Sequence, residues 1–338
     1  MQIATIGFDI AKNSFQVHGA DECGKVVLRR KLSRSKVLEF FANLPRCLVG
    51  MEACGGAHYW ARQLIKLGHD VRLMPPQYVK PYVKTNKHDA ADAEACCEAV
   101  QRPGMRFVPV KSERQQSLLM LHRIRDRLIG ERTATINAIR GLMAEFGIVA
   151  AQRQAGLKEL LAIVSDLEDE RLPPLARELL VEQAQHLRAI EARIADLDGR
   201  LVRQARDDEA SRGLIDVPGI GPVIATAMVA TVGDATLFTS SRSFAAWLGL
   251  TPRQHATGGK ERLLGISKRG DGYLRRQLMH GARSLVRVAK GRDGQLWSWI
   301  NALLARRPFN VVVAAVANKL ARIVWVILSR GEAYRLAA

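Results

Sequence analysis

The chain contains few cysteines, and their spacing excludes two common scaffolds. Among its 338 residues there are five, an odd number. They are Cys23, Cys47, Cys54, Cys96 and Cys97. Because none forms a Cys-x-x-Cys pair, neither a disulfide framework nor a zinc ribbon is expected. We therefore predict a reducing compartment and interpret all five as small buried hydrophobic residues.

Long apolar runs are also missing. No segment approaches the roughly 18 uninterrupted apolar residues of a membrane-spanning helix. The apolar run at residues 311–316 is short, and Asn318 and Lys319 separate it from the next, at 323–328. Residues 1–10 lack the basic start and the apolar core of a signal peptide. These absences predict a cytoplasmic protein with no membrane partner.

Acidic residues are scarce relative to basic ones. The chain has 51 Lys and Arg against 33 Asp and Glu, a formal net charge of +18. Such an excess attracts polyanions, of which nucleic acid is the commonest, although ribosomal and membrane-surface proteins share the signature. Hydrophobic residues make up 48% of the chain, enough for real cores, and the length predicts about two domains.

The first hundred residues have an α/β pattern. β-Prone apolar runs separated by Gly-containing turns predict a three-strand meander, followed by strands that alternate with helices. We expect strands at residues 3–10, 15–19, 25–32, 47–51 and 70–74, and helices at 35–44, 60–67 and 89–100.

The remainder is predicted to be helical. A long basic helix is expected from Glu113 to Phe146, and a second follows Pro173-Pro174. The second carries a seven-residue repeat formed by Leu180, Leu187, Ile194 and Leu201, with Ile190 and Leu197 at the other seam position. This repeat predicts a coiled-coil arm that pairs with a second subunit, with packing onto the chain's own helices as the alternative. From Arg242 onward only helices are expected.

Four acids occupy positions suited to metal binding. Asp9 and Glu52 stand where two strands should end, while Asp89 and Asp92 lie three apart at the start of a helix and share one face. Brought together, four carboxylates would repel one another unless a hard cation such as Mg²⁺ neutralised them. Taken singly, each has an ordinary alternative: a turn residue, a helix cap or first-turn acid, or a partner of a nearby arginine.

Three segments around these acids resemble a known family. They are Gly7–Lys12, Met51–Trp60 and Lys87–Ala93, and they look like the signature of DEDD-type insertion-sequence transposases. The resemblance implies an N-terminal domain like the RuvC Holliday-junction resolvase, with the four acids as ligands of two Mg²⁺ ions. It also implies a homodimer or homotetramer acting on donor and target DNA, and a noncoding bridge RNA that pairs with both.

Two segments of the C-terminal half suggest contact with nucleic acid. Residues 216–222 have the pattern of a helix-hairpin-helix turn, in which Gly219 and Gly221 would let a phosphate approach the backbone; an ordinary helix–helix turn is the alternative. Residues 244–271 again resemble the same transposases. Basic residues there are predicted to contact phosphates: Lys260, Arg262, Lys268, Arg269, Arg275 and Arg276.

The nucleophile that the family uses is missing at its expected place. The resemblance implies a serine that attacks DNA just before a Gly-Gly-Lys segment, and that position falls on Ala256. Thr257 is the alternative if the spacing shifts by one. Because alanine has no nucleophilic atom, we expect this copy to be disabled, with Thr257 as a possible substitute.

Together these patterns predict three domains: a RuvC-like, ribonuclease-H-like α/β domain at 1–110, a helical coiled-coil arm at 111–208, and an all-α domain at 209–338. The leading function is RNA-guided DNA transposition. A Holliday-junction resolvase or DEDD-type nuclease is the second possibility. A non-enzymatic helix-hairpin-helix nucleic-acid-binding protein is the third.

Overall fold

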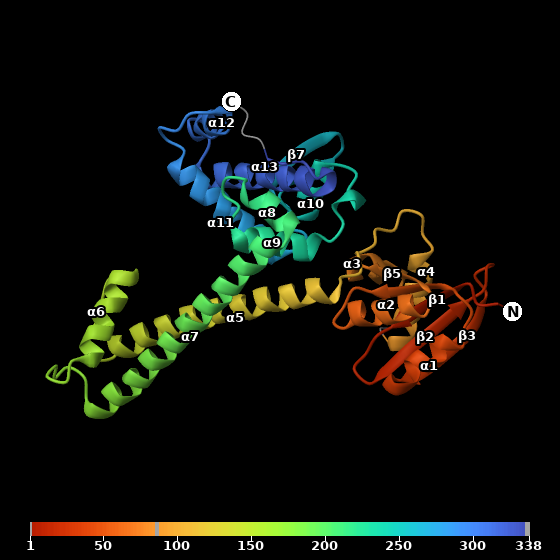
Figure 1. The fold of residues 1–338 in the computed structure, drawn as a ribbon, viewed down its shortest axis with the longest axis horizontal. Helices are drawn as coiled ribbons and strands as arrows, with labels where there is room; N and C mark the ends of the chain where they lie inside the picture. Colours follow the sequence, from red (N-terminus) through yellow and green to blue (C-terminus); the bar gives the residue numbers. More distant parts are fainter. Residues whose placement is uncertain (1, 85–87, 335–338) are drawn as a thin grey trace. The chain divides into compact units, whose positions relative to one another are not determined.

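The computed structural model describes residues 2–84 and 88–334, so Lys87 of the third motif lies outside it (Figure 1). The chain forms two compact units, residues 1–116 and 117–338. Each unit has hydrophobic clusters of its own.

The first unit is built on a five-stranded sheet in the order β3-β2-β1-β4-β5. Its strands are β1 (Thr5–Asp9), β2 (Ser14–Ala20), β3 (Val26–Ser33), β4 (Leu48–Glu52) and β5 (Asp70–Met74). β1, β2 and β3 form an antiparallel meander, whereas β4 pairs parallel to both β1 and β5. The predicted α/β character of this region is confirmed.

Helices cover both faces of this sheet. The helical elements are η1 (Arg34–Lys36), α1 (Val37–Ala42), α2 (Ala57–Lys66), α3 (Pro76–Val79), η2 (Lys80–Tyr82) and α4 (Asp89–Val100). On one face Phe8, Phe15, Phe41 and Trp60 pack ring against ring, which joins the strands to α1 and α2. The other face is covered by α4.

The second unit contains a helical arm formed by α5 (Glu113–Ala144), α6 (Gln154–Ser165) and α7 (Pro174–Asp207). α5 and α7 run antiparallel, as two polar links spaced along them show: Arg125 with Asp198, and Glu131 with His186 at 3.3 Å. Figure 1 shows the two helices side by side.

The heptad repeat of α7 is buried within this arm. Ile190, Ile194 and Leu197 pack on Leu128 of α5. Leu180 and Leu187 pack with residues of α5 and α6. In this structure the repeat packs onto the chain's own helices, as the alternative predicted, and α5 and α6 bury these side chains in place of a second subunit.

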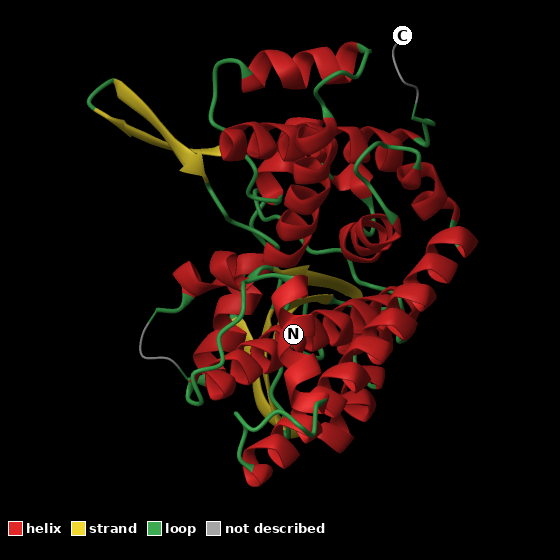
Figure 2. Ribbon diagram, turned by 90° about the vertical axis from the view of Figure 1, so that its left-hand side faces the viewer, coloured by secondary structure: helices red, strands yellow, loops and turns green. Residues whose placement is uncertain are grey.

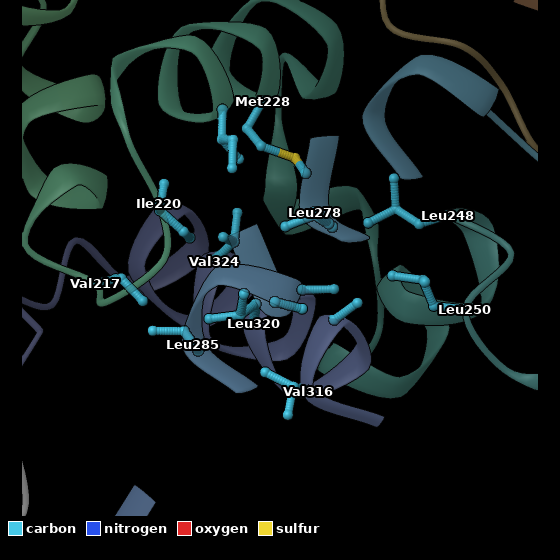
Figure 3. Packing of buried hydrophobic residues seen from close by; sticks show 14 of the residues in the cluster. Val217, Ile220, Met228, Leu248, Leu250, Leu278, Leu285, Val316, Leu320 and Val324 are labelled. Carbon is cyan, nitrogen blue, oxygen red and sulfur yellow. The ribbon is translucent and has the colours of Figure 1, made fainter. Parts of the chain in front are cut away.

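Seven helical elements follow the arm in the part of this unit that the structure describes. They are α8 (Glu209–Ile215), α9 (Pro222–Val232), η3 (Ala235–Leu237), α10 (Ser241–Trp247), α11 (Gly272–Val288), α12 (Gln295–Leu304) and α13 (Phe309–Arg330). Figure 3 shows their shared core, in which Val316, Leu320 and Val324 of α13 meet side chains from the surrounding helices. Within the described residues, α13 alone is long and apolar enough to cross a membrane. Its packing explains that composition, since it is the central helix of this core.

The C-terminal region also contains two strands, β6 (Pro252–Thr257) and β7 (Lys260–Ile266), which form an antiparallel hairpin (Figure 2). The prediction of an all-α domain is therefore wrong at this point. The turn is Gly258-Gly259, and both residues have positive φ, as a two-residue hairpin turn of type I′ requires.

A buried histidine joins the arm to the C-terminal helices. The Nε2 atom of His122 on α5 lies 3.1 Å from the Thr226 hydroxyl oxygen, and its Nδ1 lies 2.9 Å from the Tyr273 hydroxyl. The Thr226 hydroxyl donates to the Pro222 carbonyl oxygen at 2.7 Å, so it must accept from Nε2–H of His122. Burial, followed by the charge of Arg125, lowers the pKa of His122 to about 4, so the ring is neutral near pH 7 and its Nδ1 accepts from the Tyr273 hydroxyl.

Candidate functional site

The sheet positions Asp9 and Glu52 at one edge and on one face. β1 and β4 are parallel neighbours, with Gly7 opposite Gly50, and each strand ends two residues later at an acid. Side chains alternate between faces along a strand, so Gly7 and Asp9 share a face, as do Gly50 and Glu52. Both carboxylates thus belong to the α4 side, at the carboxyl ends of the strands.

Two glycines allow α4 to press against this face. A Cβ on Gly7 would lie 1.9 Å from the Ala93 carbonyl oxygen, and one on Gly50 would lie 2.6 Å from the Val100 Cβ. Both distances are far below contact, so any side chain here would lift the helix off the sheet. The Cys97 thiol also reaches the Thr5 carbonyl oxygen, at 3.7 Å.

These contacts fix the direction of α4. Thr5 meets Cys97 and Gly7 meets both Cys97 and Ala93, so the helix runs backward along β1. Its first turn therefore lies over the strand ends. That turn contains Asp89 and Asp92.

The start of α4 is capped by His88, whose Nδ1 accepts from the Ala91 nitrogen at 3.2 Å. The alternative in which Asp89 caps the helix is therefore wrong. Asp89 is instead the first helical residue, and both it and Asp92 lie where the helix dipole favours negative charge.

The other three acids of the motif influence the ionisation of Asp9. Its pKa is raised from 3.8 to about 6, first by burial and then by the charges of Asp92, Asp89 and Glu52, against a lowering hydrogen bond from the backbone of Ile10. All three other acids of the motif therefore act on Asp9. We call Asp9, Glu52, Asp89 and Asp92 the acid cluster.

The acid cluster is not a closed coordination sphere. Within residues 2–84 and 88–334, no three carboxylates, imidazoles or thiols are close enough together to hold one ion as they stand. The donor set nevertheless suits a hard divalent cation, because it offers only carboxylate oxygens, whose mutual repulsion a cation would relieve.

Two thiols lie beside the acid cluster. Cys96 on α4 is buried, and burial, with the charges of Glu52 and Asp9, raises its pKa well above the usual value. The pKa of Cys54 is raised by the same causes, yet this residue is exposed, as is Cys23. The prediction of burial is thus confirmed for Cys47, Cys96 and Cys97 but wrong for Cys23 and Cys54.

The β6–β7 hairpin carries the second group of predicted site residues. Every residue of β6 is exposed, including Ala256 and Thr257, and so are Lys260 and Arg262 of β7. Lys268 and Arg269 follow the hairpin and are also exposed. These four cations are available for phosphate contacts.

The other two predicted contacts are engaged within the fold. Arg275 donates to the carbonyl oxygens of Leu248 and Arg269, at 3.1 and 3.2 Å. Arg276 forms an ion pair with Asp126 and lies over the Tyr273 ring. Both arginines thus hold the fold together, which counts against a role in binding phosphate.

The base of the hairpin is fixed by two tight backbone contacts. A Cβ on Gly249 would lie 2.0 Å from the Arg269 carbonyl oxygen, and one on Gly270 would lie 1.9 Å from that of Trp247. The Lys268 nitrogen also donates to the Gly249 carbonyl oxygen at 3.1 Å. Arg275 also links Leu248 to Arg269 at this point, so the base of the hairpin is held in place.

The predicted helix-hairpin-helix turn connects α8 to α9. Gly219 has a φ of +83°, and a Cβ there would lie 2.9 Å from Leu285 and 3.0 Å from the Gly281 carbonyl oxygen, both on α11. Packing against α11 therefore accounts for this glycine. A Cβ on Gly221 would meet open space, so only Gly221 has room for a ligand.

Comparisons with known proteins match both regions. The DEDD transposase model of IS110 elements matches residues 6–148, and a model described as "Transposase IS116/IS110/IS902 family" matches residues 211–296. The "Probable family 20 transposase" of Pseudomonas aeruginosa is 53% identical over 99% of both chains. The chain belongs to the IS116/IS110/IS902 transposase family.

Other relatives of this transposase are similar along almost their whole length. The "Transposase for insertion sequence element IS1328" of Yersinia enterocolitica is 42% identical over 98% of both chains. That of element IS1111A of Coxiella burnetii is 42% identical over 99% of this transposase and 92% of its own length. The first matched region contains the acid cluster, and the second contains the α8–α9 turn and the hairpin.

Proposed function

We propose that this transposase cuts and exchanges DNA strands with the help of Mg²⁺ held by the acid cluster. The observation that supports it most is the arrangement of the parallel strands β1 and β4, which end at Asp9 and Glu52 on the face covered by α4, whose first turn contains Asp89 and Asp92. The raised pKa of the half-buried Asp9 agrees with this arrangement. Asp9, Glu52, Asp89 and Asp92 would hold the metal. When bound, two such ions activate an attacking oxygen and stabilise a leaving one.

Asp9 also controls when the cluster can bind a cation. With a pKa of about 6, it holds its proton in mildly acidic solution, and a cation must displace that proton before the carboxylate can act as a ligand. Glu52, at the end of the neighbouring strand, and the first turn of α4 orient the remaining oxygens toward the same edge of the sheet.

The proposal includes the partners that the family resemblance implies. Donor and target DNA would bind through the exposed cations of the hairpin and the general positive charge, and a noncoding RNA would choose both sequences by base pairing. Leaving sequence choice to RNA fits a protein whose exposed cations suit phosphates, which carry no sequence information. A homodimer or homotetramer would hold the two DNAs together. The sheet order β3-β2-β1-β4-β5 supports the RuvC-like, ribonuclease-H-like assignment of the first unit.

The test is an Asp9→Asn variant in a cleavage assay with Mg²⁺, with binding measured in parallel. Asparagine keeps the shape of the side chain but loses a charged ligand, so cleavage should fall by at least 100-fold while nucleic-acid binding is kept. Asp70→Asn is a matched control, because Asp70 begins β5, at the opposite end of the strands from the acid cluster, and pairs with Arg72. Unchanged cleavage by Asp9→Asn would refute the metal-site proposal.

A hydrolytic nuclease of the resolvase kind is the second candidate. It is favoured by Ala256, which has no hydroxyl with which to form a covalent link to DNA. DNA cut in Mg²⁺ with no protein–DNA adduct at any stage would support it over the transposase mechanism.

A further inference from the structure

The register of the β6–β7 hairpin sorts its side chains into two chemically different faces. Residues directly opposite each other share a face, and residues two apart along a strand do so too. One face carries His255, Thr257, Lys260 and Arg262. The other carries Gln254, Ala256, Glu261 and Leu263.

Only the first of these faces suits a phosphodiester. Lys260 pairs with Thr257 and Arg262 pairs with His255, so two cations flank the threonine hydroxyl. On the opposite face, Ala256 pairs with Glu261, whose carboxylate repels a phosphate, and Leu263 is 68% exposed. A phosphate drawn to the cations therefore meets the side chain of residue 257 and not that of residue 256.

The turn and the base of the hairpin fix the pairing register of β6 and β7, and so fix which side chains lie on each face. Thr257 and Lys260 are the last pair before Gly258-Gly259, and both glycines adopt the positive φ that this turn needs. A one-residue slip would exchange the two faces, but the two-residue turn fixes the pairing. At the other end, Gly249 and Gly270 leave no room for movement.

We infer that Thr257 is the residue that attacks the DNA phosphodiester, so that the transposase is not disabled at Ala256. The inference rests on the proposed function, because it assumes that DNA is cut. It replaces the expectation that the chain cannot form a covalent link to DNA.

The step can be written with atoms and protons balanced. The Thr257 Oγ1 forms a bond to phosphorus, and the bond from phosphorus to a deoxyribose oxygen breaks. The hydroxyl proton passes to the imidazole of His255, two residues back on the same face, and the released sugar oxygen takes a proton from water. Attack by a sugar hydroxyl on the phosphothreonine reverses the step, which joins DNA and restores the threonine.

The experiment uses the full-length transposase with Mg²⁺ and a plasmid that carries the ends and flanking DNA of its own element, transcribed in the same mixture. The chain as it stands should form a protein–DNA adduct that survives denaturant. Thr257→Val, which keeps the shape of the side chain, should lower the adduct yield by at least 100-fold. Thr257→Ser should retain it, and Ala256→Val on the other face should leave it within about twofold. Mass spectrometry should find the phosphate on Thr257 in the tryptic peptide 254–260.

Each other outcome decides the matter differently. DNA that is cut without an adduct would overturn the role of Thr257 and leave the metal-dependent cutting intact. An adduct that appears only with Ala256→Ser would assign the position to residue 256 and show the natural chain to be disabled. If no variant cuts DNA or forms an adduct, the proposed function fails together with the inference.

His255 is tested separately through the rate of adduct formation at one fixed pH. His255→Asn should lower that rate by at least tenfold, and added imidazole should restore part of it. An unchanged rate would show that His255 does not accept the proton, whatever the result for Thr257.

Discussion

At the scale of single residues, Asp9 and His122 respond to pH in opposite directions. Burial, followed by the charges of the three neighbouring acids, raises the pKa of the Asp9 carboxyl to about 6, because the folded protein disfavours its charge. Burial, followed by the charge of Arg125, lowers the pKa of the His122 imidazole to about 4 for the same reason. Both residues are therefore most stable in their neutral forms.

For Asp9, the sign of the effect predicts how Mg²⁺ stabilises the protein. From about pH 4 to pH 6 the unfolded chain loses its proton while the folded chain keeps it, so stability falls as pH rises, and above pH 6 the full penalty of the buried charge remains. A bound cation offsets that charge. We expect the increase in Tm caused by Mg²⁺ to be larger at pH 8 than at pH 5, measured by calorimetry. In Asp9→Asn the increase should be small at both pH values; an equally large increase there would place the ion elsewhere.

For His122, stability should fall in acid. Below pH 6.5, the pKa of His122 in the unfolded chain, the unfolded chain binds a proton. The folded chain does not bind this proton until the pH falls to about 4. The second unit should thus lose stability between these values, by up to about 3 kcal/mol for a shift of this size. Urea unfolding followed at several pH values measures the loss. His122→Gln should flatten that slope, and a slope equal to that of the parent would show that His122 is not its source.

At the scale of elements, α4 brings Asp89 and Asp92 to Asp9 and Glu52. Its packing on the sheet depends on Gly7 and Gly50, which have no side chains. Gly7→Ala would place a methyl group 1.9 Å from the Ala93 carbonyl oxygen. We expect a loss of about 3 kcal/mol of unfolding free energy, as for severe overpacking, together with loss of cleavage. Gly55→Ala is the control, since a Cβ there meets open space; it should change stability by less than about 0.5 kcal/mol. Equal effects of the two substitutions would contradict the role of this contact.

The arm makes a second prediction at this scale. Leu187 is buried against its own chain, whereas Leu179 on the same helix is 52% exposed. Leu187→Ala should lower the unfolding free energy by 2–5 kcal/mol, roughly the range for large buried aliphatic residues, and leave the oligomeric state unchanged. Leu179→Ala should have little effect on stability. If sedimentation showed that Leu187→Ala dissociates the oligomer, the repeat of α7 would have to lie at a subunit interface.

The sequence predicts features that depend on neighbouring residues, but not those that depend on contacts between distant segments. The strands and α4 were predictable because alternation and apolar runs are local patterns, and the four acids stood at the ends of those elements. The partner of the α7 repeat was not, because Leu187 packs equally well on a helix of either chain. The hairpin was missed although Gly258-Gly259 between alternating residues is a hairpin signal. The structural roles of Gly7, Gly50 and Arg275 depend on contacts that form only in the folded chain.

At the scale of the whole molecule, a net charge of +18 dominates binding to nucleic acid. Affinity should fall linearly with salt on a log–log plot, with a slope of about 0.9 per phosphate neutralised. Replacing Lys260 or Arg262 by Gln should reduce that slope by about one each. Leu263→Gln, on the opposite face of the hairpin, should leave it unchanged. A slope insensitive to Lys260 and Arg262 would remove the hairpin from the binding surface.

The exposed hairpin also gives the transposase a natural cleavage point for proteases. Two-stranded hairpins are only marginally stable by themselves, and this one presents Arg253, Lys260 and Arg262 on exposed strands beside a glycine turn. Brief treatment with trypsin should therefore sever the chain here and release a C-terminal fragment that contains α11, α12 and α13. DNA seated on the cationic face would shield these bonds. The rate at which this fragment appears should then measure the fraction of the protein that is bound to DNA. The measurement needs no radioactive or fluorescent label.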